Sequence, residues 1–132
     1  MASIFTRIIN GEIPCYRVAE DERFIAFLDV RPLKPGHTLV VPKKEVDYIF
    51  DLDAETLSGL TLFAQKVAVA MKEVIECNRI GVAVLGLEVP HAHVHLVPIT
   101  EESDLRFSNP RVSPSPEENE RLARAIGERV RL

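Results

Sequence analysis

Three closely spaced histidines are the residues of this sequence best suited to carrying out chemistry. The chain has four histidines, and three of them occupy alternate positions in the segment His91-Ala92-His93-Val94-His95. Because side chains alternate along a β-strand, this spacing predicts three imidazoles on one face of a strand. A packed face favours apolar side chains and a solvated face favours charge or threonine, so three imidazoles together indicate a functional site.

Three interpretations of this cluster are open. Alternate histidines on a strand can bind zinc and leave a position for water, although a closed zinc site needs a fourth ligand. The imidazoles could instead form only a solvated or hydrogen-bonded surface. In the third interpretation they catalyse a reaction, since an unperturbed pKa of about 6.5 lets one ring attack while another stabilises an anion. Phosphorus suits that chemistry, because in-line attack by an imidazole nitrogen gives a phosphoramidate intermediate.

The pattern of apolar residues predicts the elements that position this cluster. Five segments are predicted strands, at residues 15–19, 24–28, 38–41, 80–85 and 91–99. From the N-cap residue Asp53, apolar side chains follow helical spacing over residues 53–77, which predicts one long helix. A short N-terminal helix and a C-terminal helix that begins at Ser115-Pro116-Glu117-Glu118 complete the set. We therefore expect an α+β fold with a mainly antiparallel sheet of about five strands.

Composition and charge exclude several classes of protein. A net charge of −4 without a lysine or arginine run argues against binding to nucleic acid. Apolar stretches are short, which predicts no membrane span and no secretory signal. Cys15 and Cys77 lie far apart and form no pair, so we expect reduced thiols and a cytoplasmic protein.

The domain organisation is expected to be simple. We expect residues 1–100 to form the domain that carries the histidines, and residues 101–132 to add a tail and a helix packed on that domain. Leu62, Phe63 and Val69 make the apolar surface of the predicted long helix broader than one sheet face requires. That surplus is typical either of a homodimer contact or of a helix buried deeply in its own monomer.

The residues around the cluster also resemble a known family. His91-Ala92-His93-Val94-His95-Leu96-Val97 is similar to the His-x-His-x-His motif, followed by two apolar residues, that names the histidine-triad (HIT) family. The likeness extends over roughly residues 3–99 and includes, in the family's order, Gly11-Glu12-Ile13-Pro14, Phe27-Leu28-Asp29-Val30-Arg31-Pro32 and Pro35-Gly36-His37-Thr38-Leu39-Val40-Val41-Pro42-Lys43-Lys44. The resemblance implies a HIT-like nucleotide-binding domain over residues 1–100 and a homodimer formed through the long helix and a strand edge.

The resemblance also implies roles for particular residues. His93 would attack the α-phosphate, His91 would orient His93 through its backbone carbonyl, and His95 would hydrogen-bond the phosphate. Asp29 would bind the ribose hydroxyls. The resemblance implies a purine pocket and phosphate loop formed by Ile4, Phe5, Ile8, Phe27, Val30, Gly86, Glu88 and Val89. Considered without the resemblance, the apolar members of this set are typical core residues, and Asp29 could cap a turn. His37 is expected to be a structural hydrogen-bonding residue.

Several positions depart from the family pattern. Glu45 stands where many relatives carry a histidine of the proton relay, and Leu87 and Glu88 replace an amide and a hydroxyl of the phosphate loop. Ser3 and Thr6 stand where many bacterial relatives carry zinc-binding cysteines, so we expect neither a metal nor a cofactor.

These observations predict a hydrolase or transferase that forms a covalent nucleotidyl-histidine from a purine nucleoside phosphoramidate or phosphoanhydride. The departures motivate an alternative, a nucleotide-binding regulatory protein with little turnover. A zinc protein with three histidine ligands is a further alternative.

Overall fold

A five-stranded antiparallel sheet forms the centre of the fold, and the computed structural model describes residues 2–132. The strands lie in the order β1-β2-β3-β5-β4, so that β5 is inserted between β3 and β4. The elements are α1 (Ile4–Ile9), β1 (Arg17–Glu20), β2 (Phe24–Leu28), β3 (Thr38–Pro42), α2 (Ala54–Val74), β4 (Arg79–Ala83), β5 (Val94–Ile99) and α3 (Pro116–Gly127), with short 3₁₀ helices at Ile49–Asp51 and Glu102–Leu105. This confirms the predicted α+β class.

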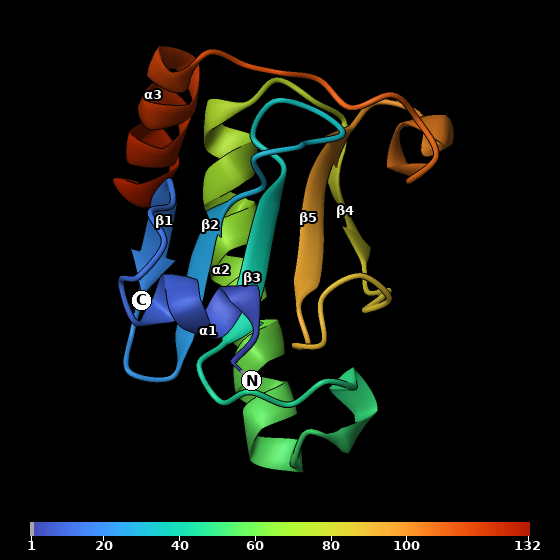
Figure 1. The fold of residues 1–132 in the computed structure, drawn as a ribbon. Helices are drawn as coiled ribbons and strands as arrows, with labels where there is room; N and C mark the ends of the chain where they lie inside the picture. The colour runs from blue at the N-terminus through green and yellow to red at the C-terminus, as the bar shows by residue number, and fades with distance from the viewer. Residues whose placement is uncertain (1) are drawn as a thin grey trace.

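The helices cover the two faces of the sheet unequally. Figure 1 shows α2 behind the sheet and the short α1 in front of it, while the segment after β5 crosses one end of the sheet before α3. The larger core lies between the sheet, α2 and α3, and includes Leu60, Met71 and Leu96. A smaller apolar cluster lies under α1 and contains Phe5, Ile25, Phe27, Leu39 and Val41. The sheet therefore has two buried faces, which explains why every residue of β2 and β3 is buried.

Local capping signals explain where the two longer helices begin. The Asp53 carboxylate accepts a hydrogen bond of 2.7 Å from the backbone N–H of Thr56, and the Ser115 hydroxyl accepts one of 3.1 Å from Glu118. Pro116 takes the first helical position, where a missing N–H costs nothing. The Glu118 side chain contacts Arg121, so the predicted reciprocal half of the capping box is not formed. The long helix ends at Val74, three residues before the predicted end, because Ile75 is extended.

The strand of the triad begins later than the sequence pattern predicts. We expected a strand over residues 91–99, but β5 starts at Val94 and pairs with β3 only through Val94, His95 and Leu96. Before that point, the Ala92 N–H donates to the Val46 carbonyl at 2.7 Å, which lies outside the sheet. His91 and His93 consequently precede the ladder. The three imidazoles nevertheless lie together on the α1 face, because the Phe5 ring contacts both His91 and His93, and the His93 ring contacts His95.

No helix within residues 2–132 is long and apolar enough to cross a membrane.

Candidate functional site

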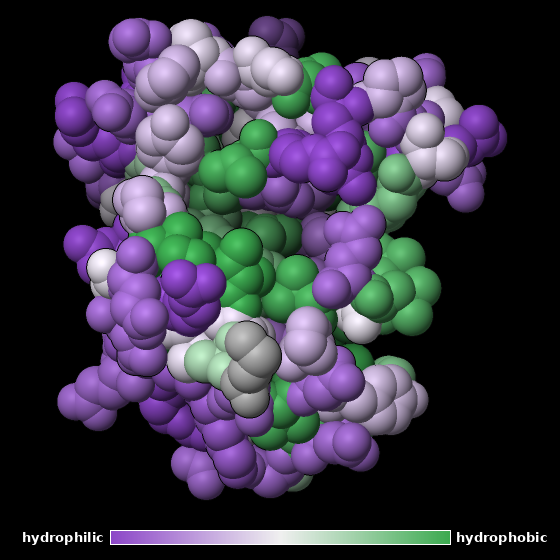
Figure 2. Space-filling view, in the orientation of Figure 1, coloured by the Kyte–Doolittle hydropathy of each residue, from purple (hydrophilic) through white to green (hydrophobic). Residues whose placement is uncertain are grey.

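A cavity of about 350 Å³ opens on the α1 face of the sheet and contains two of the triad histidines. Figure 2 shows hydrophobic side chains gathered around a hollow in the middle of this face, with hydrophilic side chains along its rims. The cavity is lined by residues of α1, the loop after β2, the loop between β4 and the triad, the triad itself and the C-terminal segment: Ile4, Phe5, Asp29, Val30, Arg31, Leu39, Leu85, Gly86, Leu87, Glu88, Val89, His93, His95, Phe107 and Arg111.

His93 presents an unprotonated nitrogen to this cavity. Its Nδ1 lies 2.7 Å from the backbone carbonyl oxygen of His91, and since a carbonyl can only accept, Nδ1 must carry the proton. In the neutral ring Nε2 then keeps a free lone pair. Burial lowers the pKa of His93, and the Phe5 ring packs edge-on against the imidazole at 4.9 Å between centroids. His93 therefore has the form of a neutral, oriented nucleophile at pH 7.

His91 lies behind the cavity and supports His93. The buried ring donates from Nε2 to the carbonyl oxygen of Pro42 at 2.7 Å, so its Nδ1 accepts from the Ser3 hydroxyl, also at 2.7 Å. Both ring nitrogens are thus engaged by the protein. The backbone carbonyl of the same residue receives the His93 proton, which is the orienting role that the family resemblance implied.

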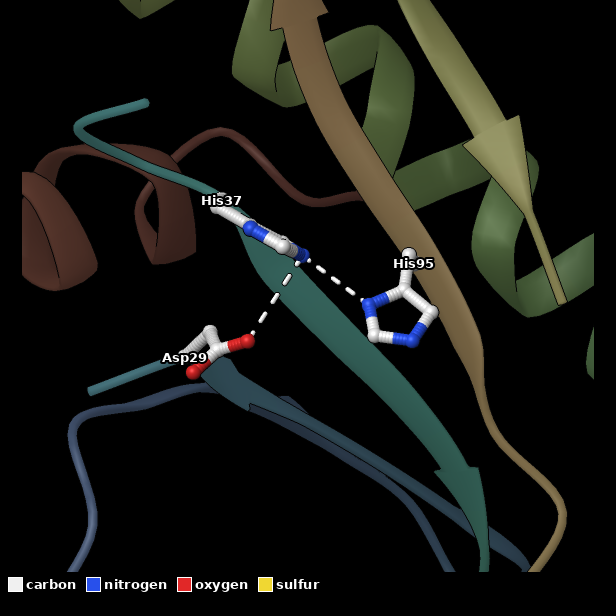
Figure 3. Close-up of side chains that lie close together, drawn as sticks. All are labelled: Asp29, His37 and His95. Carbon is white, nitrogen blue, oxygen red and sulfur yellow. Dashed lines mark hydrogen bonds and ion pairs between the residues drawn. The ribbon is translucent and has the colours of Figure 1, made fainter. Parts of the chain in front are cut away.

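His95 is fixed by His37, the fourth histidine of the chain, as Figure 3 shows. The backbone N–H of Leu33 donates to His37 Nδ1 at 3.0 Å, so the neutral ring carries its proton on Nε2. That N–H donates to His95 Nδ1, also at 3.0 Å. Consequently the neutral His95 ring carries its proton on Nε2, beside the cavity, where it can donate to an anionic ligand.

The burial of these two rings predicts a pH dependence of stability. Burial lowers the pKa of His37 to about 3 and that of His95 to about 4, whereas both rings titrate at about 6.5 in the unfolded chain. Between these limits the unfolded state binds more protons, so stability is lost as pH falls. We expect the free energy of unfolding to decrease below pH 6.5 by up to about 1.4 kcal/mol per pH unit for each histidine.

Denaturant unfolding between pH 7 and pH 4 measures this dependence. The variant His37→Gln removes one of the two titrating groups and should show a shallower slope than the wild type. Equal slopes in the two proteins would contradict the assignment of His37 as a buried neutral base.

Asp29 serves both as a turn cap and as part of the cavity. Its Oδ1 accepts a hydrogen bond from the backbone N–H of Arg31 at 2.9 Å. This is the turn-capping role that the sequence analysis gave as an alternative for Asp29. Its Oδ2 lies 3.7 Å from His37 Nε2 and 3.9 Å from Arg111 Nη1. Burial raises the pKa of Asp29, and the hydrogen bond from the Arg31 backbone N–H and then the charge of Arg111 oppose that rise.

The chemistry of these donors argues against a metal. One potential ligand atom each from Asp29, His37 and His95 lies within 4.8 Å of the others. However, His37 Nδ1 accepts a backbone N–H, so a metal on Nε2 would require the fully deprotonated ring. A site made of the triad alone fails for a similar reason, because both His91 nitrogens are already engaged.

Ser3, Thr6 and Glu45, three of the departures from the family pattern, form a hydrogen-bonded network with His91. Glu45 Oε1 accepts from the Ser3 backbone N–H at 2.8 Å and from the Thr6 hydroxyl at 2.5 Å, and the Thr6 contact is the main cause of its lowered pKa. Ser3 in turn donates to His91. Two of these groups are neutral hydroxyls, which are poor zinc ligands compared with thiolates. Glu45 therefore anchors α1 over the triad and is not an ordinary solvated side chain.

The structure brings most of the predicted nucleotide-binding residues together. Ile4, Phe5, Asp29, Val30, Gly86, Glu88 and Val89 all line the cavity. Ile8 and Phe27 do not, because they pack into the cluster beneath Phe5, whose ring contacts Phe27 at 5.6 Å between centroids. Leu87 is 90% exposed at the rim, and Glu88 also lies there.

Six residues that line the cavity were not among the predicted site residues. Two of them, Phe107 and Arg111, come from the segment expected to form a tail, and the other four are Arg31, Leu39, Leu85 and Leu87. For Phe107 and Arg111, the residue types alone could have suggested a role in binding, and nothing in their spacing indicates contact with the triad.

Comparison with known proteins identifies the family. Residues 10–102 match the family model for the HIT domain. The chain belongs to the HIT family. This confirms the family resemblance inferred from the histidine motif and the residues upstream of it. An adenosine 5′-monophosphoramidase of Schizosaccharomyces pombe is 32% identical over 99% of this chain and 100% of its own length.

Solved HIT structures are similar over nearly the whole chain. A HIT-like protein of Bartonella henselae, described as involved in cell-cycle regulation and solved with an unknown ligand, has 36% identity and a TM-score of 0.82, covering 96% of this chain and 95% of its own. A zinc-bound histidine triad family protein of Mycobacterium smegmatis has 34% identity and a TM-score of 0.83, covering 97% and 94%. The HIT fold assignment therefore includes the C-terminal helix.

Proposed function

We propose that this HIT protein is a metal-independent nucleotide hydrolase or transferase. Its substrate would be a purine nucleoside 5′-phosphoramidate or a related phosphoanhydride, attacked at the α-phosphate. The observation that carries this proposal is the state of His93, a neutral ring whose Nε2 lone pair faces the cavity beside the N–H of His95. The 5′-monophosphoramidase relatives support the same reaction class.

The reaction proceeds in two displacements. His93 Nε2 attacks phosphorus in line, and the new N–P bond forms as the bond to the leaving nitrogen or oxygen breaks. His95 donates its Nε2 proton as a hydrogen bond to a non-bridging oxygen, and the leaving group takes up a proton from water. Water then cleaves the N–P bond, which releases the nucleoside monophosphate and returns His93 to its neutral form.

The remaining cavity residues suit the nucleoside half of this substrate. Ile4, Phe5 and Val30 provide apolar surface for a purine, and Ile8 and Phe27 support that surface from beneath. Asp29 accepts hydrogen bonds from the ribose hydroxyls, and Gly86, Glu88 and Val89 border the phosphates. His91 acts only through His93.

A specific feature favours a second candidate, a nucleotide-binding regulatory protein with little turnover. Glu88 lines the cavity beside His93, where its negative charge slightly opposes the lowering of the His93 pKa by burial. The same carboxylate would repel an incoming phosphate. Leu87 and Glu45, which replace an amide and a relay histidine, point in the same direction.

A substrate panel separates the two candidates. The purified protein is assayed with adenosine and guanosine 5′-phosphoramidates, dinucleoside polyphosphates and nucleotide sugars, and nucleotide binding is measured in parallel by calorimetry. Release of nucleoside monophosphate over many turnovers supports the enzyme. Binding with no multiple turnover on any member of the panel supports the regulatory protein.

We also propose that the functional protein is a homodimer, and this predicts the effect of a surface charge. Leu62 and Val69 lie seven residues apart on α2 and are 58% and 59% exposed, and Val82 on the edge strand β4 is 61% exposed. Burying these side chains in a partner copy would remove apolar area from water. We therefore expect Val69→Glu to convert a dimer to a monomer.

Light scattering over a concentration series measures this change, since a weak dimer dissociates on dilution. Ser113→Glu, at an exposed position outside α2 and β4, is the control for one added negative charge. A wild-type protein that is monomeric throughout the series would contradict the dimer.

Glu45 gives a further prediction, which concerns the leaving group. If the missing relay histidine limits protonation, Glu45→His should raise turnover of an amine-leaving phosphoramidate more than that of a nitrophenyl nucleotide ester, because only the amine needs the proton. General acid assistance is worth about 10²–10⁴-fold, so even partial restoration is measurable. If Glu45→His changes the turnover of both substrates equally, or of neither, position 45 takes no part in protonating the leaving group and Glu45 serves only to anchor α1.

A further inference from the structure

One wall of the cavity comes from the C-terminal segment, outside residues 10–102 that match the HIT domain. This segment is fixed to the rest of the site at several points. The Val112 N–H donates to the Pro32 carbonyl at 3.0 Å, and Asp104 pairs with Lys34 at 3.2 Å. These two contacts hold the C-terminal segment against the loop after β2, so that its side chains form a fixed wall of the cavity.

Arg111 is the charged side chain that this wall contributes. Its Nη1 donates to the backbone carbonyl of Arg31 at 2.6 Å, and its guanidinium carbon lies 5.6 Å from the centroid of the Phe107 ring. The Phe107 ring in turn packs edge-on against His95, with 4.8 Å between centroids. These contacts hold the guanidinium in one place, with Nη1 at 3.9 Å from Asp29 Oδ2.

That placement matters because Asp29 has a partly buried carboxyl with one oxygen left for a ligand. Its Oδ1 is used by the Arg31 N–H, whereas Oδ2 faces Arg111 and His37. Burial favours the protonated carboxyl, which would lose acceptor capacity. The hydrogen bond from the Arg31 backbone N–H and then the charge of Arg111 oppose protonation. Among the charged side chains, Arg111 has the largest effect on Asp29, and its Nη1 lies 3.9 Å from Oδ2.

We propose that Arg111 is a positioning residue that holds Asp29 ionised and oriented, and thereby makes the site select a ribose over a deoxyribose. The inference rests on the proposed function, in which Asp29 accepts the ribose hydroxyls. It assigns to the C-terminal segment a part in substrate selection. Arg111 acts through Asp29 and not on the reacting phosphate.

The test compares two substrates that differ only in the sugar. Adenosine 5′-phosphoramidate and its 2′,3′-dideoxy analogue are assayed with wild type, Arg111→Met, Arg111→Lys and Asp29→Asn. A hydrogen bond to a charged acceptor is worth about 10- to 100-fold, so the wild type should prefer the ribonucleoside in kcat/KM by about that factor. Arg111→Met and Asp29→Asn should each lose most of the preference while the dideoxy substrate changes little, and Arg111→Lys should recover part of it.

Two controls isolate the sugar contact. Arg106→Met changes an exposed arginine of the same segment that does not line the cavity, and it should leave the preference unchanged. The double variant Arg111→Met/Asp29→Asn should show the same sugar preference as Asp29→Asn alone, because both substitutions remove the same contact to the ribose. An Arg111→Met variant that slows both substrates equally, or neither, overturns the inference.

Binding separates this inference from the proposed function. Calorimetry with adenosine monophosphate and its 2′,3′-dideoxy analogue measures the sugar preference without turnover. If the wild type binds but does not turn over, the hydrolase proposal fails while loss of sugar preference in Arg111→Met still supports the inference. A wild type that binds both nucleotides equally overturns it.

Discussion

His93→Ala should lower turnover of a nucleoside phosphoramidate by about 10⁴–10⁶-fold, because the nucleophile that forms the covalent intermediate is lost. Nucleotide binding should remain within about tenfold of wild type, since a nucleophile stabilises mainly the transition state. Steady-state kinetics and calorimetry measure the two quantities on the same preparation.

The control for this variant is Ser3→Ala, which removes the hydroxyl that supports His91 but leaves the backbone carbonyl that orients His93. It should be far less damaging than His93→Ala, and both variants should show a single cooperative unfolding transition. An His93→Ala protein with most of the wild-type rate would remove His93 from the nucleophilic role.

His95→Phe should give the second largest loss, about 10²–10³-fold in kcat, which is the usual effect of deleting one donor to a developing negative charge. The variant keeps a ring of similar shape but has no N–H for the phosphate. It also leaves the Nε2–H of His37 without its acceptor, so a lower unfolding temperature is expected.

His95→Gln is the matched variant, because its amide can donate to an oxygen at similar reach. It should retain more activity than His95→Phe. If the two variants are equally active, or if His95→Phe stays within tenfold of wild type, the hydrogen bond from His95 does not stabilise the transition state.

Local signals in the sequence predicted the elements of the fold with good accuracy. The side chains of Asp53 and Ser115 each accept a hydrogen bond from the backbone N–H three residues later. A short stretch of sequence is therefore enough to predict where these two helices begin. The start of β5 could not be predicted in this way, because Ala92 leaves the ladder to bond with Val46, which is 46 residues earlier.

The site shows the same division between local and distant information. The alternation of the histidines identified the functional segment, but the proton positions depend on backbone groups elsewhere. The proton position of His93 is set by the carbonyl of His91, two residues away. That of His91 is set by the distant carbonyl of Pro42. That of His95 is set by His37, whose own proton is placed by the Leu33 N–H. Arg111 meets Asp29 only through the fold, 82 residues along the chain.

The stereochemical course at phosphorus tests the central claim most directly. A single diastereomer of a chiral adenosine 5′-phosphorothioate amide is hydrolysed in isotopically labelled water, and the configuration of the thiophosphate product is determined by nuclear magnetic resonance. Two in-line displacements through a nucleotidyl-His93 intermediate predict net retention of configuration. Net inversion would show direct attack by water and would contradict the account.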